Sequence, residues 1–378
     1  MSHLNLAHDA LQRIDRDPAR SYTLPGFYYY DPDIFEREKR AIFYRTWQYV
    51  GHVSMLATPG RYIVREIVDQ SVIVLRDREG ALRSYFNVCQ HRAHRLLEGE
   101  GQLPAASITC PYHTWTYDLG GNLRKARATD RVAGFDPAAF GLKPLRLESF
   151  LGFLFVNLDG AAAPFETVSG PLAAEIASFS PHAASLKCAH RDEYPLKANW
   201  KNSVENYSEC YHCPNQHQTL VNGALDIDSY RVVTFEHHHS HSSRDKGAST
   251  GYSTRTEGSN RPGEFASWLL WPNWSIESYP GGNLTVFHHV PLGPEESVQR
   301  CEWYFPYETP SAADREVIDF VHEVRREDIP ICESVQKGLH SLGYRQGRFV
   351  VDADRSDISE HAVHDFQMKV LTALGEKG

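Results

Sequence analysis

Two histidines and a carboxylate lie within nine residues of one another near the middle of the chain. Glu209, His212 and His217 belong to the stretch ANWKNSVENYSECYHCPNQHQ, residues 198–218. Two imidazoles and one carboxylate form the ligand set of non-haem Fe(II) sites that activate oxygen. Side chains five residues apart on one α-helix point in different directions, so we expect Pro214 to break the helix and bring the two rings together. Glu209 is either a ligand or a neighbour that orients one.

A second set of candidate ligands lies earlier in the chain, where Cys89 and His91 are followed, after eighteen intervening residues, by Cys110 and His113. Zinc also accepts two cysteines and two histidines, but zinc fingers usually pair like with like. A Rieske [2Fe–2S] centre needs two thiolates on one iron and two imidazoles on the other. One cysteine and one histidine on each of two loop tips provide that arrangement, so the pattern predicts a Rieske cluster held by these four residues.

Four stretches of the sequence resemble Rieske non-haem iron oxygenase alpha subunits. CQHRAHRLLEGEG and ITCPYHTWTYDLGGNL are similar to the cluster-binding domain of this family. NWKNSVENYSECYHCPNQH and REDIPICESVQKG are similar to its catalytic domain. The resemblance covers nearly the whole chain and implies an oxygenase that carries a Rieske [2Fe–2S] cluster and a mononuclear Fe(II).

The resemblance also implies a role for individual residues. The mononuclear iron would be held by His212, His217 and Asp328, and the cluster by the two Cys-His pairs. Glu209 would act as a bridge between the two metal centres, because a carboxylate that contacts a ligating histidine fixes its orientation. Its partners would be His212 and the cluster ligand His113.

The substrate class is suggested by Glu209, because ring-dihydroxylating members of the family usually have Asp at this position. Glutamate followed by CYHC resembles the branch that acts on quaternary ammonium compounds such as carnitine, glycine betaine and dimethylproline. Aromatic faces attract such cations, which makes Tyr207, Trp268 and Trp271 candidate substrate residues. The alternative for these residues is packing in a core, where most aromatic residues of a sheet lie.

The expected activity is hydroxylation or oxidative N-demethylation of a small betaine-type substrate with O2. We find no dinucleotide-binding glycine motif, so electrons are expected from NAD(P)H through a separate flavin/iron–sulfur reductase. The resemblance implies a homotrimer. The alternatives are an aromatic-substrate Rieske oxygenase, which performs ring dihydroxylation or O-demethylation, and an electron-transfer protein with an added binding domain.

Composition narrows the possible partners and location. The 378-residue chain has a net charge of −9, which argues against nucleic-acid or anionic-membrane partners. The sequence contains no run of about 18 apolar residues, so no membrane span is predicted. The N-terminus lacks the layout of a secretory signal, and we therefore expect a cytoplasmic protein. Seven cysteines without an export signal favour reduced thiols, and we expect Cys210 and Cys213 to be buried and free.

The sequence predicts an α+β protein in which helices and strands position these residues. We expect an N-terminal helical segment (1–44) that packs on the catalytic domain and begins a helix at Asp31-Pro32. An all-β Rieske domain (45–160) and a helix-grip-type catalytic domain with a large antiparallel sheet (161–378) follow.

Five local predictions concern the catalytic domain. We expect residues 237–241, which contain four histidines, to be a solvated cluster, and residues 244–261 to be a loop. An amphipathic helix over 314–326 is expected to end at 327–330, before a second helix through Val335 and Leu339, and a last helix is expected over 359–374.

Overall fold

The computed structural model describes residues 13–244, 263–279 and 283–376. Contacts divide the chain into two units, one of residues 43–165 and one that joins the segment ending at Ile42 to the segment from Glu166 onward. The loop predicted at 244–261 lies, except for its first residue, outside the described residues.

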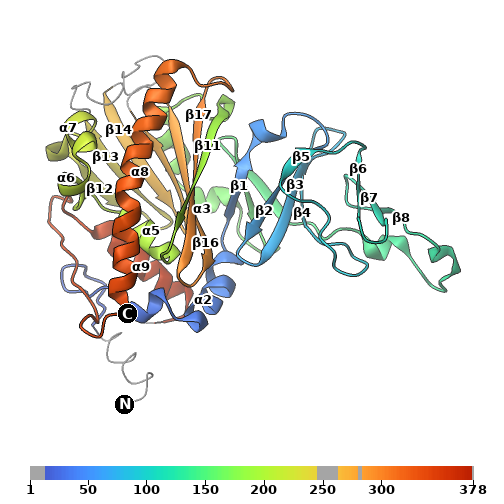
Figure 1. The fold of residues 1–378 in the computed structure, drawn as a ribbon, viewed down its shortest axis with the longest axis horizontal. Helices are drawn as coiled ribbons and strands as arrows, with labels where there is room; N and C mark the ends of the chain where they lie inside the picture. The colour runs from blue at the N-terminus through green and yellow to red at the C-terminus, as the bar shows by residue number, and fades with distance from the viewer. Residues whose placement is uncertain (1–12, 245–262, 280–282, 377–378) are drawn as a thin grey trace. The chain divides into compact units, whose positions relative to one another are not determined.

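The unit of residues 43–165 consists of three antiparallel sheets connected by turns (Figure 1). Its sheet orders are β1-β10-β9, β4-β3-β2-β5 and β6-β7-β8. The strands of this unit are β1 (Gln48–His52), β2 (Arg61–Ile67), β3 (Gln70–Arg76), β4 (Leu82–Phe86), β5 (Glu100–Gln102), β6 (Ser107–Thr109), β7 (Thr116–Asp118), β8 (Leu123–Lys125), β9 (Arg146–Phe150) and β10 (Phe153–Asn157).

One buried core supports both predicted cluster loops of this unit. The loops connect β4 to β5 and β6 to β7. Strand residues such as Ile73, Tyr85 and Tyr117 pack in the same hydrophobic cluster as Cys89 and Cys110. The two loop tips are therefore anchored by the side chains that hold the sheets together.

The other unit is built on a seven-stranded antiparallel sheet with the order β11-β17-β16-β15-β14-β13-β12. β11 and β12 are its edge strands. The strands are β11 (Lys187–Leu196), β12 (Arg231–Thr234), β13 (His238–Arg244), β14 (Glu264–Leu270), β15 (Trp274–Ser278), β16 (Leu284–Gly293) and β17 (Glu296–Phe305).

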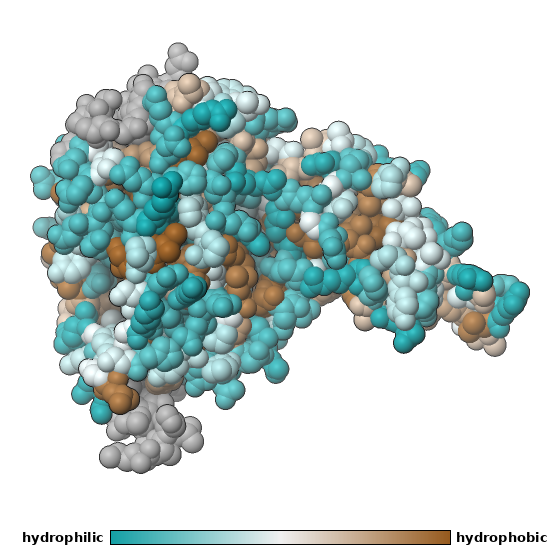
Figure 2. Space-filling view, viewed as in Figure 1, coloured by the Kyte–Doolittle hydropathy of each residue, from teal (hydrophilic) through white to brown (hydrophobic). Residues whose placement is uncertain are grey.

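Helices complete this unit, and the longest, α8, lies across one face of the sheet (Figure 1). Figure 2 shows mainly hydrophilic side chains over that side of the unit. This architecture confirms the predicted α+β class with a large antiparallel sheet. The helices are α2 (Pro32–Glu38), α3 (Phe165–Ser169), α4 (Leu172–Phe179), α5 (Trp200–Tyr207), α6 (Cys213–Gln216), α7 (Gln218–Gly223), α8 (Ala312–Leu339) and α9 (His361–Ala373).

The prediction that the helix from Asp314 ends before Pro330 is wrong. α8 continues through Pro330 to Leu339. A proline inside a helix costs about 3 kcal/mol because one backbone hydrogen bond is lost. The buried side of α8 continues beyond the proline with Cys332, Gln336 and Leu339, and we attribute the continuity to this burial. The last helix, α9, lies within the predicted range.

The segment before residue 43 contacts α5 through buried polar side chains. Asp31 caps α2, as predicted, by accepting a hydrogen bond from the Asp33 backbone N–H. At the other end of α2, Glu38 accepts hydrogen bonds from Trp200 Nε1 at 2.9 Å and Lys201 Nζ at 2.5 Å. The Glu38 and Lys201 side chains are fully buried. Removing one partner of such a buried ion pair destabilises the folded protein by about 3–5 kcal/mol, because the other charge stays buried and unpaired.

The histidines of residues 237–241 do not form a solvated cluster, so that prediction is wrong. His238, His239 and His241 are buried. They lie on β13, an interior strand that pairs with both β12 and β14. Burial lowers the pKa of His241 to about 3, and its Nδ1 lies 2.9 Å from the Tyr230 hydroxyl.

None of the described helices is both long enough and hydrophobic enough to span a bilayer.

Candidate metal centres

The predicted iron segment, residues 198–218, begins just before α5 and ends at the first residue of α7. Asn199 caps α5 by accepting a hydrogen bond from the Lys201 backbone N–H. The helix ends at Tyr207, before the break predicted at Pro214, which instead lies in the first turn of α6. His212 and His217 are the N-cap and C-cap residues of the four-residue helix α6, and the non-helical backbone of His217, between α6 and α7, changes the direction of the chain between the two rings.

The prediction that Cys210 and Cys213 are free thiols is wrong, because the structure joins them in a disulfide. The turn between α5 and α6 explains why they meet. The Cys213 N–H donates to the Cys210 carbonyl at 3.0 Å, and the two Cα atoms lie 4.9 Å apart, within the range that a disulfide spans. The spacing of the two cysteines was visible in the sequence, but the turn was not.

Three ligand atoms converge where residues 212–217 meet α8. His212 Nε2 lies 3.1 Å from His217 Nε2. Oδ1 of Asp328 lies 3.0 Å from His217 Nε2 and 3.5 Å from His212 Nε2. Asp328 and His217 are buried, and His212 is partly exposed. The structure thus brings together the three residues that the resemblance assigns to the mononuclear iron.

Each of the two imidazoles is held by a carboxylate at its other nitrogen. Oε1 of Glu209 lies 2.5 Å from His212 Nδ1, and Oε2 of Glu327 lies 2.7 Å from His217 Nδ1. Because a carboxylate accepts, each Nδ1 carries a proton, and each Nε2 is the nitrogen that faces Asp328 and that would exchange its proton for a metal ion. Glu209 therefore lies outside the group of three.

Arg325 orients the Asp328 carboxylate. Its Nη2 lies 2.8 Å from Asp328 Oδ2, the oxygen that does not face the histidines. Burial raises the pKa of Asp328, but the charge of Arg325 and hydrogen bonds from His212 and His217 outweigh burial and lower this pKa below its usual range. Burial lowers the pKa of His212, but hydrogen bonds to Asp328 and Glu209 raise it to about 10. These carboxylates favour a positive charge between the imidazoles.

The donor set fits a mononuclear iron. Two imidazole nitrogens and one carboxylate oxygen face a common point, as in the facial triads that leave positions open for O2 and substrate. Both imidazoles have carboxylates behind them, which is the usual support of a ligating histidine.

The two predicted cluster loops have nearly the same backbone hydrogen bonds. The Cys89 N–H donates to the His94 carbonyl at 2.9 Å, and the Ala93 N–H donates to the Cys89 carbonyl at 3.1 Å. The second loop repeats this pattern around Cys110, Thr114 and Trp115, at 2.8 and 3.0 Å. The fourth residue after each cysteine has a left-handed backbone, with φ of 57° at Ala93 and 58° at Thr114.

The side chains of these loops fit a Rieske cluster. Cys89 and Cys110 are buried, and the Tyr117 hydroxyl lies 3.3 Å from Cys89 Sγ. The rings of His91 and His113 lie 4.6 Å apart between centroids. Two buried thiols beside two adjacent imidazoles are the donors that a [2Fe–2S] cluster of this type needs.

The three aromatic candidates for the substrate pocket are not brought together. Tyr207 is buried, with its ring 5.7 Å from Phe287, and burial raises its pKa well above the usual value although the nearby Ser267 hydroxyl opposes the rise. Trp268, the next residue of β14, must face the opposite side of the sheet, where its Nε1 donates to Glu175 at 2.9 Å. Trp271 packs on Phe366 of α9 at 5.5 Å.

Sequence reasoning missed two charged residues beside the candidate iron site. Glu277 and Arg325 are 6% and 8% exposed. Oε2 of Glu277 and Nε of Arg325 have no hydrogen-bond partner among the described residues. Burial raises the pKa of Glu277 to about 7, which the charge of Arg325 opposes. A buried polar atom without a hydrogen-bond partner is costly unless a ligand supplies one.

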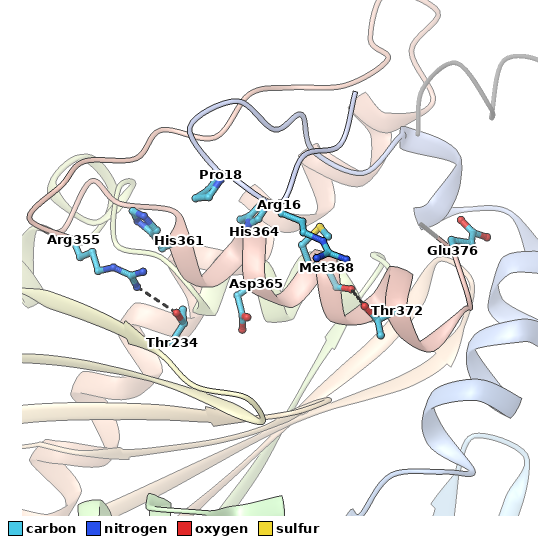
Figure 3. Close-up of a pocket in the computed structure, with 10 residues that line it drawn as sticks. All are labelled: Arg16, Pro18, Thr234, Arg355, His361, His364, Asp365, Met368, Thr372 and Glu376. Atoms are coloured by element: carbon cyan, nitrogen blue, oxygen red, sulfur yellow. Dashed lines mark hydrogen bonds between the residues drawn. The ribbon is translucent and has the colours of Figure 1, made fainter. Parts of the chain in front are cut away.

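A separate cavity of about 750 Å³ lies beside α9 (Figure 3). Its lining includes Arg16, Arg355, His361 and His364 but none of the predicted ligand or substrate residues. Neighbouring groups already satisfy much of this lining. For example, His364 Nε2 lies 2.8 Å from the Asp15 carbonyl oxygen.

Comparisons with known proteins identify both units. The family described as "Ring hydroxylating alpha subunit (catalytic domain)" matches residues 183–376, and the Rieske [2Fe-2S] domain family matches residues 46–136. The carnitine monooxygenase oxygenase subunit of Escherichia coli (strain K12) is 37% identical over 365 residues, which cover 93% of each chain.

Two solved structures of a quaternary ammonium Rieske monooxygenase are also similar, at 34% identity over 96% of this chain and 97% of the other. One contains the substrate L-carnitine and has a TM-score of 0.85. The other is described in relation to carnitine oxidation and inter-subunit electron transfer and has a TM-score of 0.86. These findings confirm the resemblance drawn from the sequence: the chain belongs to the Rieske-type ring-hydroxylating oxygenases, an oxidoreductase family whose members carry a Rieske [2Fe–2S] cluster and a mononuclear iron.

Proposed function

We propose that this chain is the oxygenase component of a monooxygenase that hydroxylates or N-demethylates a betaine-type quaternary ammonium substrate. The observation that carries this proposal is that two buried residues of opposite charge, Glu277 and Arg325, each have an atom without a hydrogen-bond partner among the described residues. The similar proteins named above act on carnitine or on quaternary ammonium compounds. A betaine joins a permanent cation to a carboxylate, so it supplies a partner for each of the two side chains.

The substrate cation would lie at Glu277. The neighbouring hydroxyl groups of Tyr207 and Tyr279 oppose the rise in the pKa of Glu277 that burial causes. The ring of Phe287 lies beside Tyr207. A carboxylate among aromatic rings suits a quaternary ammonium group, which cannot donate a hydrogen bond and is attracted by charge and by ring faces. The substrate carboxylate would lie at Arg325, whose Nη2 already contacts Asp328.

The metal ligands would be the residues that the sequence predicts, namely His212, His217 and Asp328 for iron and two Cys-His pairs for the cluster. When bound, the two iron centres together supply the reductive activation of O2. In the reaction, one oxygen atom is inserted into a C–H bond of an N-methyl group, and the other becomes water with two electrons and two protons. The N-hydroxymethyl group then loses its hydroxyl proton, and the C–N bond breaks. Its electron pair stays on nitrogen, and formaldehyde leaves.

Glu209 is proposed to connect the two metal centres. Its Oε1 accepts from His212 Nδ1, and its Oε2 accepts from the His212 backbone N–H at 3.2 Å. Both oxygens keep a lone pair for a cluster histidine. We expect Glu209→Gln to slow reoxidation of the reduced cluster while iron content stays unchanged. Stopped-flow absorption measures this step, and reoxidation at the wild-type rate would refute the bridge.

The electrons are proposed to come from NAD(P)H through a separate flavin/iron–sulfur reductase, and the chain is proposed to form a homotrimer. Electron transfer between subunits, described for a similar protein, supports an oligomer. Sedimentation velocity of the purified holoenzyme measures the assembly. A monomer that turns over at full rate would contradict it.

Product analysis tests the proposed reaction. We would measure O2 uptake and formaldehyde release with a panel of betaines, a surrogate reductase and NADH, and with the His212→Ala variant as the inactive control. Formaldehyde in proportion to O2 consumed supports N-demethylation, and a hydroxylated betaine supports hydroxylation. A cis-diol from an aromatic compound, with no turnover of any betaine, would establish the aromatic-substrate alternative instead.

A further inference from the structure

A second group of two histidines and one carboxylate lies on the large sheet, away from the residues assigned to iron. It consists of His190, Asp192 and His322, each partly exposed. One ligand atom from each residue lies within 4.8 Å of the other two. Nε2 of His190 is 2.5 Å and Nε2 of His322 is 3.0 Å from Oδ2 of Asp192. Among the described residues, only this group and the candidate iron ligands meet that criterion.

The packing of β11 against α8 brings these three side chains together. His190, Asp192 and Tyr194 alternate along the edge strand β11, so they project from the same face of the sheet. α8 lies over this face and contributes His322. The ring of Trp303 forms an aromatic floor, at 5.3 Å from His190 and 5.7 Å from His322 between centroids.

The Tyr194 hydroxyl fixes the orientation of His322 through a hydrogen bond to Nδ1. A hydroxyl can donate to a bare Nδ1 or accept from a protonated one. It therefore supports both the state in which Nε2–H donates to Asp192 and the state in which Nε2 offers a lone pair. Such a hydrogen bond behind the ring is the usual support of a metal-ligating histidine.

We propose that His190, Asp192 and His322 bind a divalent transition-metal ion of the zinc class at the junction of β11 and α8. Two imidazoles, one carboxylate and one water complete the four-coordinate shell that Zn²⁺ prefers, and the partial exposure of all three residues admits the water. The alternative is a hydrogen-bonded surface cluster in which Asp192 only accepts hydrogen bonds from the two rings.

Such an ion would connect the edge strand to the helix that carries Asp328. His322 and Asp328 are six residues apart on α8, so the ion would fix this helix to the sheet near the proposed iron ligand. Because the ligands do not exist as a group in the unfolded chain, metal binding stabilises the folded state.

The test is zinc binding to the holoenzyme. Protein loaded with both iron cofactors is equilibrated with ZnCl2 and desalted, and zinc and iron per chain are measured by mass spectrometry. We expect one zinc per chain with unchanged iron in the wild type. Binding should be at least about tenfold weaker in His190→Ala and Asp192→Asn, since each loses one ligand. His182→Ala, which removes an exposed histidine outside the group, should bind like the wild type.

Thermal unfolding provides a second measurement. Zinc should raise the melting temperature of the wild type and of His182→Ala but not that of His322→Ala. Tyr194→Phe should weaken zinc binding without abolishing it, because the ligands remain and only the orientation of His322 is lost. Zinc that stays bound to His190→Ala and His322→Ala, zinc that replaces iron, or no zinc on the wild type would overturn the proposal.

Discussion

The loops that present Cys89 and Cys110 are shaped by the backbone, whereas His212 and His217 are oriented by side chains. In the loops, each cysteine begins a turn with two backbone hydrogen bonds and one left-handed residue. At the candidate iron site, carboxylates hold both rings from behind. The difference indicates that the cluster site depends on local sequence, while the iron site depends on tertiary contacts.

The largest expected effects come from deleting a ligand at either centre. His212→Ala should reduce oxygenation to background while the visible absorption of the cluster remains. Cys89→Ser should remove that absorption, because a cluster iron loses a thiolate. Absorption spectra and O2 uptake of the two variants measure this separation. Turnover by His212→Ala would contradict the iron assignment.

Next in size is the loss of a carboxylate behind an iron ligand. Glu327→Gln should lower iron affinity by about 10- to 100-fold, since the support of His217 Nδ1 is weakened. Iron content after dialysis at a series of Fe(II) concentrations measures the change. Glu323→Gln is the matched control, because Glu323 lies one turn earlier on α8 and contacts Thr219 instead. Equal affinity in both variants would show that the iron site does not depend on this contact.

A smaller effect is expected on substrate affinity. Glu277→Gln should raise KM for the betaine about tenfold, because a nearby opposite charge is lost. The pKa of Glu277 is about 7, and only the ionised carboxylate attracts a cation. The wild-type KM should therefore rise as pH falls from 8 to 6, and the KM of the variant should not. A parallel rise in both would exclude Glu277 from the pocket.

The smallest effect is expected in the cluster loops. Ala93→Gly relieves the left-handed backbone but increases the freedom of the unfolded chain, and these contributions oppose each other. The free energy of unfolding should change by less than about 1 kcal/mol, with unchanged cluster absorption. Ala93→Val should destabilise the loop, since a β-branched residue tolerates this conformation poorly. Chemical denaturation of the two variants compares them, and loss of the cluster in Ala93→Gly would contradict backbone control.

The same contrast explains what could be predicted from the sequence. The cluster ligands are close in sequence and their spacing reflects the loop geometry, so Cys89, His91, Cys110 and His113 could be proposed from spacing alone. Asp328 needed the family resemblance, because 111 residues separate it from His217.

The roles of Glu327 and Glu277 could not be predicted from the sequence. The contact of Glu327 with His217 joins residues that lie far apart in the sequence, and it depends on α8 packing beside the segment that carries His217. Glu277 is a charged residue on a buried strand, and only the pairing of β15 with β16 and the packing of α8 bring it close to Arg325. The position of Trp268 could not be predicted either. The face of the sheet that it occupies depends on strand register, and the spacing of the tryptophans does not determine that register.

The assignment of the mononuclear iron is tested most directly by counting iron in the Asp328→Ala variant. A cluster of two irons plus one mononuclear iron predicts three irons per chain in the wild type. Asp328→Ala should contain two irons, with the visible absorption of the cluster unchanged and no oxygenation. Three tightly bound irons in Asp328→Ala, or turnover without the third, would contradict the account.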